Sequence, residues 1–181
     1  MKEISLNILD IAENSVKARA TLTEITVNET DDTLTLKISD NGCGMTAETL
    51  KAVIDPFYTT RTTRKVGMGL PLLKMEAEQT GGTFGISSKA ESEYPEDHGT
   101  EVTAVFNKKH IDYTPLGDVV SSIVTLIQGH PDTDFLFMHT CGSKSVTLDT
   151  RELRAVLEEV PLNSYEVLKF IEETLRKEEN I

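Results

Sequence analysis

The segment Asp40–Met45, which reads Asp-Asn-Gly-Cys-Gly-Met, constrains the fold of this chain more than any other stretch. It directly follows Thr33–Ser39, a run with the alternation and β-branched residues of a strand. The glycines after the strand allow a tight turn and a close approach of the backbone to a ligand. A carboxylate at a strand end can accept a hydrogen bond from the exocyclic amine of a base, whereas a base carbonyl there would be rejected. The segment therefore indicates either base recognition by Asp40 or an ordinary polar turn.

The hydrophobic pattern before and after this segment alternates between helical and strand periods. Ile4, Ile8 and Ile11 recur at helical spacing and predict a first helix that ends near Ala18. The other elements expected in the first part of the chain are strands at Glu24–Asn28, Thr33–Ser39, Thr83–Ser88 and Glu101–Phe106, with helices at Glu48–Ile54 and Leu70–Gln79.

The pattern changes after Asn107, and we place a domain boundary near Lys109, which gives segments 1–109 and 110–181. The second segment contains no catalytic constellation, and its apolar helix faces indicate the core of a small α/β appendage with a partner-binding or dimerisation role. Its expected elements are helices at Asp118–Gln128, Arg151–Glu159 and Ser164–Lys177, with a hairpin formed by Asp134–His139 and Ser145–Asp149.

Charge and cysteine content exclude several classes of function. A formal net charge of -12 disfavours nucleic acid as a partner, because phosphate backbones are held by clustered Lys and Arg. Cys43 and Cys141 lie far apart without metal-ligand spacing, which disfavours a zinc site or a disulfide framework. No apolar run is long enough for a membrane span. We therefore expect a soluble protein of the reducing cytoplasm.

Two polar residues of the first helix, Asp10 and Asn14, are four positions apart and share one helix face. A carboxylate at this place could orient water beside a terminal phosphate, while an amide oxygen could ligate Mg²⁺, which keeps several waters and takes phosphate oxygens. The alternative is a solvated polar face without a ligand.

A basic loop precedes the helix at Leu70–Gln79, and Gly67 and Gly69 immediately precede that helix. The free amide groups of a helix N-terminus bind phosphate, and the nearby cations Arg61, Arg64 and Lys65 supply counter-charge. Gly-x-Gly before a helix is a weak motif whose plain alternative is a flexible turn.

These segments, in this order and spacing, resemble the N, G1, F and G2 boxes of the GHKL superfamily of gyrase, heat-shock chaperone, histidine kinase and MutL ATPases. Glu13–Thr21 and Ile38–Met45 look like the mismatch-repair branch, whereas Pro56–Thr60 and Val66–Leu70 look like histidine kinases. Gly99–Val102 is a fourth match, and the resemblance covers Lys2 to Phe106. It implies an α/β (α+β) two-layer sandwich of the Bergerat type, with helices on one face of a mixed sheet, and binding of ATP with Mg²⁺.

The resemblance also implies roles for individual residues. Asn14 would ligate Mg²⁺, Asp40 and Thr100 would contact adenine, and Asp10 would be the catalytic base. The residues expected to shape the rest of the nucleotide pocket and its lid are Gly42, Gly44, Met45, Phe57, Thr60, Arg61, Lys65, Gly67, Gly69 and Leu70.

This sequence departs from the family pattern at two places. Asp10 stands where gyrase-like members have Glu, and its side chain is one methylene shorter, which brings hydrolysis into question. The segment between Phe57 and Gly67 is short, and Lys65 stands where the fuller kinase pattern has a glycine. A short lid closes less completely over a nucleotide.

The expected function is that of a stand-alone histidine-kinase-like protein that binds ATP and Mg²⁺ and acts on a protein partner in trans as a regulatory ATPase or protein kinase. Because the first helix begins at the N-terminus, we expect no phosphoacceptor histidine ahead of the pocket. The whole chain resembles stand-alone GHKL proteins found alongside iron-hydrogenase and NADH-dehydrogenase-like genes, which implies a redox-related partner. The alternatives are a nucleotide-sensing module without turnover, a nucleotide-free interaction module that has lost the pocket, and a mismatch-repair-type ATPase. Asn14, Asp40 and the paired glycines disfavour the second, and the acidic balance disfavours the third. A homodimer built on the second segment is a further expected assembly.

Overall fold

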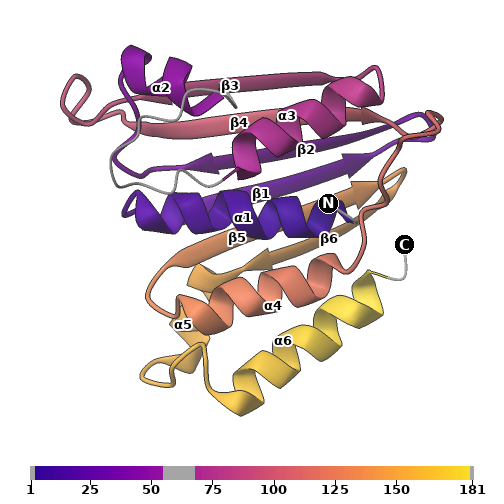
Figure 1. Cartoon of the computed structure of the whole chain (residues 1–181). Helices are drawn as coiled ribbons and strands as arrows, with labels where there is room; N and C mark the ends of the chain where they lie inside the picture. The colour runs from indigo at the N-terminus through magenta and orange to yellow at the C-terminus, as the bar shows by residue number, and fades with distance from the viewer. Residues whose placement is uncertain (1–2, 55–67, 180–181) are drawn as a thin grey trace.

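The strands within the described residues form one mixed six-stranded sheet in the order β3-β4-β2-β1-β5-β6 (Figure 1). The computed structural model describes residues 3–54 and 68–179. All neighbouring strands are antiparallel except β1 and β5, which are parallel. The strands are β1 (Leu22–Glu29), β2 (Thr33–Asp40), β3 (Thr83–Lys89), β4 (Gly99–Asn107), β5 (Asp134–Cys141) and β6 (Lys144–Asp149).

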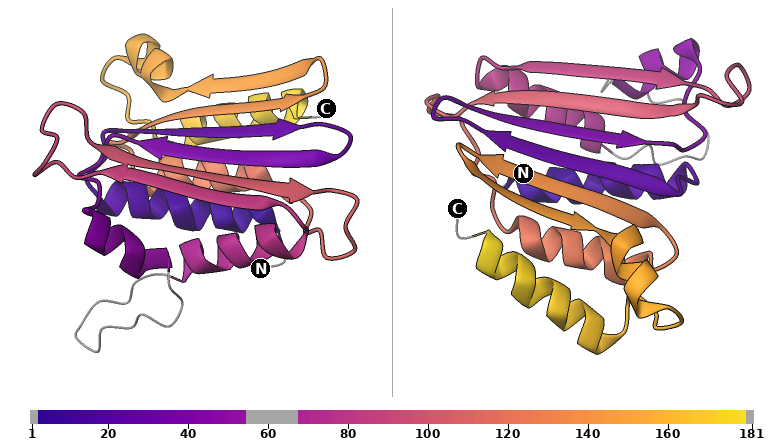
Figure 2. Two further views of the ribbon diagram at one scale, coloured as in Figure 1. Left: turned by 90° about the horizontal axis from the view of Figure 1, so that it is seen from above. Right: turned by 180° about the vertical axis from the view of Figure 1, so that it is seen from behind.

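Among the described residues, the long helices cover one face of this sheet (Figure 2). α3, α1, α4 and α6 lie side by side across the covered face, so that the expected two-layer sandwich with a mixed sheet is confirmed. The helices are α1 (Ile4–Lys17), α2 (Ala47–Ile54), α3 (Gly69–Gln79), α4 (Val119–Gly129), α5 (Thr150–Leu157) and α6 (Tyr165–Glu178). None of the helices within residues 3–54 and 68–179 is long and apolar enough to cross a membrane.

One hydrophobic core lies between the sheet and the helix layer. On α1 the residues at helical spacing, Ile4, Ile8 and Ile11, face this core and are at most 3% exposed. Alternate strand residues reach it from the other side because successive strand side chains point to opposite faces. Ile25 on β1 and Ile38 on β2 are among them. α1 is therefore fixed along its length over the middle of the sheet.

The elements after residue 109 extend the same sheet and the same helix layer. β5 pairs with β1 from Leu22↔Asp134 to Glu29↔Cys141, and α4 packs between α1 and α6. The connection that leads into α4 also touches the start of α1, because the amide of Ile4 donates to the carbonyl of Pro115 at 3.0 Å. The α/β appendage thus continues the sheet; the domain boundary near Lys109 stays a prediction.

Candidate functional site

A cavity of about 210 Å³ opens beside the ends of α1 and β2. Its walls are mostly apolar, and Asp40 is the one carboxylate among the described residues that line it. An apolar slot with a few convergent polar groups is the usual form of a small-molecule site. The lining residues are Ile11, Asn14, Ser15, Ala18, Ile38, Asp40, Gly44, Met45, Val53, Leu70, Thr100 and Val102.

The Asp40 carboxylate is held in place by its own chain. The Ser15 hydroxyl of α1 donates to Asp40 Oδ2 at 2.7 Å, and the Gly42 amide donates to Asp40 Oδ1 at 2.9 Å. Each carboxylate oxygen has two lone pairs, so that each keeps acceptor capacity for a ligand. The sequence pattern placed Asp40 at the end of a strand, and the structure adds that α1 fixes its orientation.

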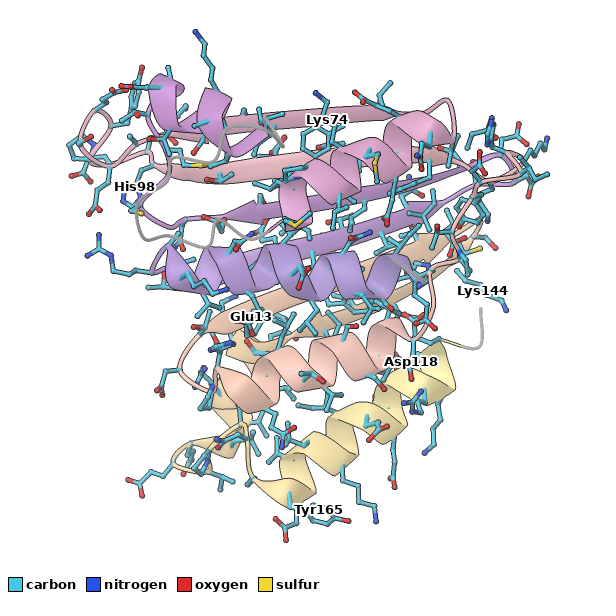
Figure 3. All side chains as sticks on the ribbon, in the orientation of Figure 1. Glu13, Lys74, His98, Asp118, Lys144 and Tyr165 are labelled. Carbon is cyan, nitrogen blue, oxygen red and sulfur yellow. The ribbon has the colours of Figure 1, made fainter. Side chains whose placement is uncertain are left out.

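The loop after Asp40 follows the backbone of the β3–β4 hairpin closely. Gly44 has φ +60, and a Cβ there would lie 1.9 Å from the carbonyl oxygen of Lys89, so that any side chain at this position would collide. The Glu91 amide donates to the Cys43 carbonyl at 2.9 Å. His98 contacts the Gly42 carbonyl through Nδ1 at 2.6 Å, and Figure 3 places His98 at the end of the sheet where this loop lies.

Thr100 faces Asp40 directly across the β2–β4 pair, at the register Asp40↔Thr100. Its hydroxyl lies 2.8 Å from Ser88 Oγ on β3. Ser88 Oγ also accepts from the Met45 amide at 2.8 Å and contacts the Gly99 carbonyl at 2.9 Å. Ser88 therefore links the loop, β3 and β4 behind the cavity wall.

Asn14 and Asp10 occupy different places on the same face of α1. Asn14 lines the cavity, and its side chain has no hydrogen-bond partner within the described parts of the chain. Asp10 is exposed and lies beside the start of α3, because a Cβ on Gly69 would be 3.3 Å from Asp10 Cβ and 3.7 Å from Asp10 Oδ2. Asp10 thus lies next to a helix N-terminus, the kind of place where phosphates bind.

The fold brings most of the expected site residues together. Asn14, Asp40, Gly44, Met45, Leu70 and Thr100 line the cavity, whereas Gly42 and Gly69 support it through the contacts above. Other expected residues lie outside the described ranges: Phe57, Thr60, Arg61, Lys65 and Gly67.

Residues outside the expected set also contribute to the site, among them Val53, Val102 and Ser88. Val53 on α2 and Val102 on β4 line the apolar wall. The strand alternation signals that Val102 points inward, whereas nothing in the sequence marks Val53. Ser88 belongs to the site through its contacts with Thr100 and Met45. The sequence does not predict this role, since a serine on a strand with alternating exposure is common.

The described residues contain no group of three His, Cys, Asp or Glu side chains that could hold a metal ion by themselves. An Mg²⁺ ion does not need such a group, because it keeps several waters and takes phosphate oxygens from its substrate. The free amide oxygen of Asn14 at the cavity wall fits that donor set.

The sequence is similar to a part of several bacterial sensor kinases. It is 36% identical over 88 residues to the signal transduction histidine-protein kinase AtoS of Escherichia coli, an alignment covering 49% of this chain and 14% of that protein. It is 33% identical over 86 residues to a probable C4-dicarboxylate sensor kinase of Bacillus subtilis, covering 48% of this chain and 15% of the relative. The chain therefore matches a small part of the length of each of these relatives.

The fold is similar to those of solved protein domains. The Aquifex aeolicus MutL ATPase domain complexed with ADP superimposes with a TM-score of 0.55 at 14% identity, covering 98% of this chain and 88% of that one. The N-terminal domain of a DNA repair protein gives a TM-score of 0.54 at 14% identity, covering 82% of this chain and 53% of that one.

A model of the family described as histidine kinase-, DNA gyrase B- and HSP90-like ATPases matches residues 2–110, which is more than half of the sequence. Those residues contain the cavity and its Asp40 carboxylate. The chain belongs to the histidine kinase-, DNA gyrase B- and HSP90-like ATPase family.

Proposed function

We propose that this protein binds ATP with Mg²⁺ and acts on a protein partner in trans as a histidine-kinase-like regulatory ATPase or protein kinase. The observation that carries the proposal is the fixed Asp40 carboxylate in a mostly apolar cavity. It fits the exocyclic amine of a flat aromatic base, while the apolar walls cover the base on its faces. The AtoS and MutL relatives, a kinase and an ADP-bound ATPase domain, support this choice of ligand.

The placement of Asn14, Asp10 and Gly69 supports a path for the triphosphate that runs from the cavity to the start of α3. From the adenine at Asp40, the phosphates would pass Asn14, which would ligate Mg²⁺, and would reach the start of α3 beside Asp10. Mg²⁺ would neutralise phosphate charge there, and Asp10 would orient the attacking water. Gly42, Gly44, Met45, Gly67, Leu70 and Thr100 would complete the pocket, with Phe57, Thr60, Arg61 and Lys65 from the lid.

The contacts between the two segments favour an action on a partner. Glu13, next to Asn14 on α1, lies 2.8 Å from His130 Nε2 at the end of α4, and Figure 3 shows Glu13 on the side of α1 that faces α4. A change at the nucleotide would therefore reach the 110–181 segment through a short path. We assign partner binding to that segment, and a redox-related protein or a second copy of the chain would be the partner.

A nucleotide-sensing module without turnover is the second candidate, and Asp10 favours it. The Asp10 side chain is exposed and shorter than a glutamate, so that a water bound to it is held less firmly over the phosphate. In that case the nucleotide state alone would control the partner.

A single-turnover experiment tests the proposal. The protein is mixed with ATP labelled at its terminal phosphate and with Mg²⁺, and free phosphate and protein-bound label are followed together with bound nucleotide. Phosphate release supports an ATPase, whereas retained nucleotide without release or labelling supports the sensing module. Absence of saturable ATP binding at millimolar nucleotide would overturn both.

A further inference from the structure

Ser88 lies behind the cavity wall, outside the set of residues that line it, and its hydroxyl has three polar neighbours. A serine hydroxyl has one hydrogen to donate and two lone pairs that accept. The Met45 amide can only donate, so it takes one lone pair at 2.8 Å. The Gly99 carbonyl can only accept, so it takes the hydrogen at 2.9 Å.

These two bonds fix the direction of the third. Because the Ser88 hydrogen is committed to Gly99, the 2.8 Å contact between Ser88 Oγ and Thr100 Oγ1 requires Thr100 to be the donor. The Thr100 hydroxyl then has no hydrogen left for the cavity and presents only lone pairs to it. Within the described ranges, Thr100 Oγ1 has no other hydrogen-bond partner.

The geometry points to Ser88 as a positioning residue for base selection: by taking the Thr100 hydrogen, it makes Thr100 a second obligate acceptor beside Asp40. This inference rests on the proposed ATP binding and adds a determinant of specificity to it. Thr100 and Asp40 are directly opposed across β2 and β4, and side chains so opposed have Cβ atoms about 4.5–5.5 Å apart. Acceptors carried on two such neighbouring Cβ atoms can each meet one of the two hydrogens of an exocyclic amino group, directly or through a water.

A base with a carbonyl at the same position makes two unfavourable contacts. Its oxygen faces the lone pairs of Asp40 and those of Thr100, and a site that leaves buried polar groups unpaired discriminates strongly. If Ser88 were absent, the Thr100 hydroxyl could rotate and donate to such a carbonyl. Discrimination would then fall although Thr100 itself is unchanged.

The test compares ATP with ITP, in which a carbonyl replaces the amino group. Dissociation constants for both, with Mg²⁺, are measured by calorimetry for the wild type, Ser88→Ala, Ser88→Thr and Ser87→Ala. Ser87 neighbours Ser88 on the exposed face of β3 and serves as the matched control. We expect Ser88→Ala to reduce the preference for ATP over ITP by about threefold to tenfold, the worth of one hydrogen bond. Ser88→Thr, which keeps the hydroxyl, and Ser87→Ala should retain the preference.

A merely structural role gives a different result. If Ser88 only holds the loop at Met45 in place, Ser88→Ala lowers the affinities for ATP and for ITP by the same factor. An unchanged ratio of the two dissociation constants therefore overturns the inference. The Thr100→Val background gives a second test: there Ser88→Ala should no longer change the ratio, because Ser88 acts through Thr100. If Ser88→Ala changes the ATP to ITP ratio in Thr100→Val as much as it does in the wild type, the inference is also overturned. If the wild type binds no ATP, the proposed function fails and this inference with it; wild-type ATP binding with an unchanged ratio removes this inference alone.

Discussion

Ser15 donates a 2.7 Å hydrogen bond to Asp40, which joins the last turn of α1 to the end of β2. The carboxylate is thereby oriented before any ligand arrives. A ligand that meets an already ordered group does not have to supply the cost of ordering that side chain, which is about 0.5–1.5 kcal/mol for a flexible one.

Replacement of Asp40 by asparagine is expected to weaken ATP binding by roughly tenfold to a hundredfold, because a hydrogen bond to a charged group is worth about 1.5–3 kcal/mol. The change is nearly isosteric, so that the temperature of unfolding should shift little. Calorimetric titration with ATP measures the effect, and Asp31→Asn in the exposed turn between β1 and β2 is the control. Wild-type affinity in Asp40→Asn would place the base elsewhere.

Asp10→Asn should leave ATP affinity within about twofold of the wild type, because Asp10 lies at the start of α3 rather than in the lining of the cavity. Any phosphate release should fall on the order of a hundredfold or more, the usual contribution of a general base. Single-turnover phosphate release reports the change, with Asp132→Asn in the exposed α4–β5 connection as the control. Hydrolysis that survives in Asp10→Asn would refute the base assignment.

Gly44 and Gly142 offer a matched pair of substitutions, since both have φ +60. Alanine costs about 1–2 kcal/mol at either position for the left-handed backbone. At Gly142 a Cβ meets nothing within 4 Å, whereas at Gly44 it would lie 1.9 Å from the Lys89 carbonyl oxygen. We expect Gly44→Ala to lose more free energy of unfolding than Gly142→Ala in denaturant titrations, and to lose ATP affinity as well. Equal losses would mean that the loop has room to move away from Lys89.

His139 should make stability depend on pH. Its side chain is 5% exposed, with Nδ1 2.8 Å from Glu179 and Nε2 3.1 Å from Glu29. Burial alone would lower the pKa of His139, but the hydrogen bond and charge of Glu179, followed by those of Glu29, outweigh it and raise the pKa above its usual value.

The sign of that dependence follows from the raised pKa. The folded protein holds the proton more tightly than the unfolded chain, whose imidazole pKa is about 6.5. The stabilisation is therefore complete below about pH 6.5 and is lost as the pH rises through the raised folded value. Denaturant titrations between pH 6 and pH 9 should show this fall for the wild type and for His110→Gln, which alters a half-buried histidine. The fall should be reduced in His139→Gln; an equal fall in both variants would assign it to other groups.

Helix faces and strands could be predicted from the sequence because they depend on the spacing of residues that are close together in the chain. The α1 face formed by Ile4, Ile8 and Ile11 and the strand that leads to Asp40 follow from periodicity, and both are present within a residue or two of the expected bounds. The apposition of Asp10 and Gly69 follows only from tertiary packing. The role of Ser88 depends on the β3–β4 register, which places it beside Thr100 and which no short-range pattern determines.

The pairing of β1 with β5 has a consequence for the order of folding. β1 lies inside the sheet only after Asp134–Cys141 has been added, since these residues occupy its second edge. During synthesis the whole family-matched part, residues 2–110, emerges before that cover exists. Until then the backbone N–H and C=O groups along one side of Leu22–Glu29 remain open to any strand that reaches them. The last third of the chain thus protects the nascent ATPase fold from pairing with its neighbours.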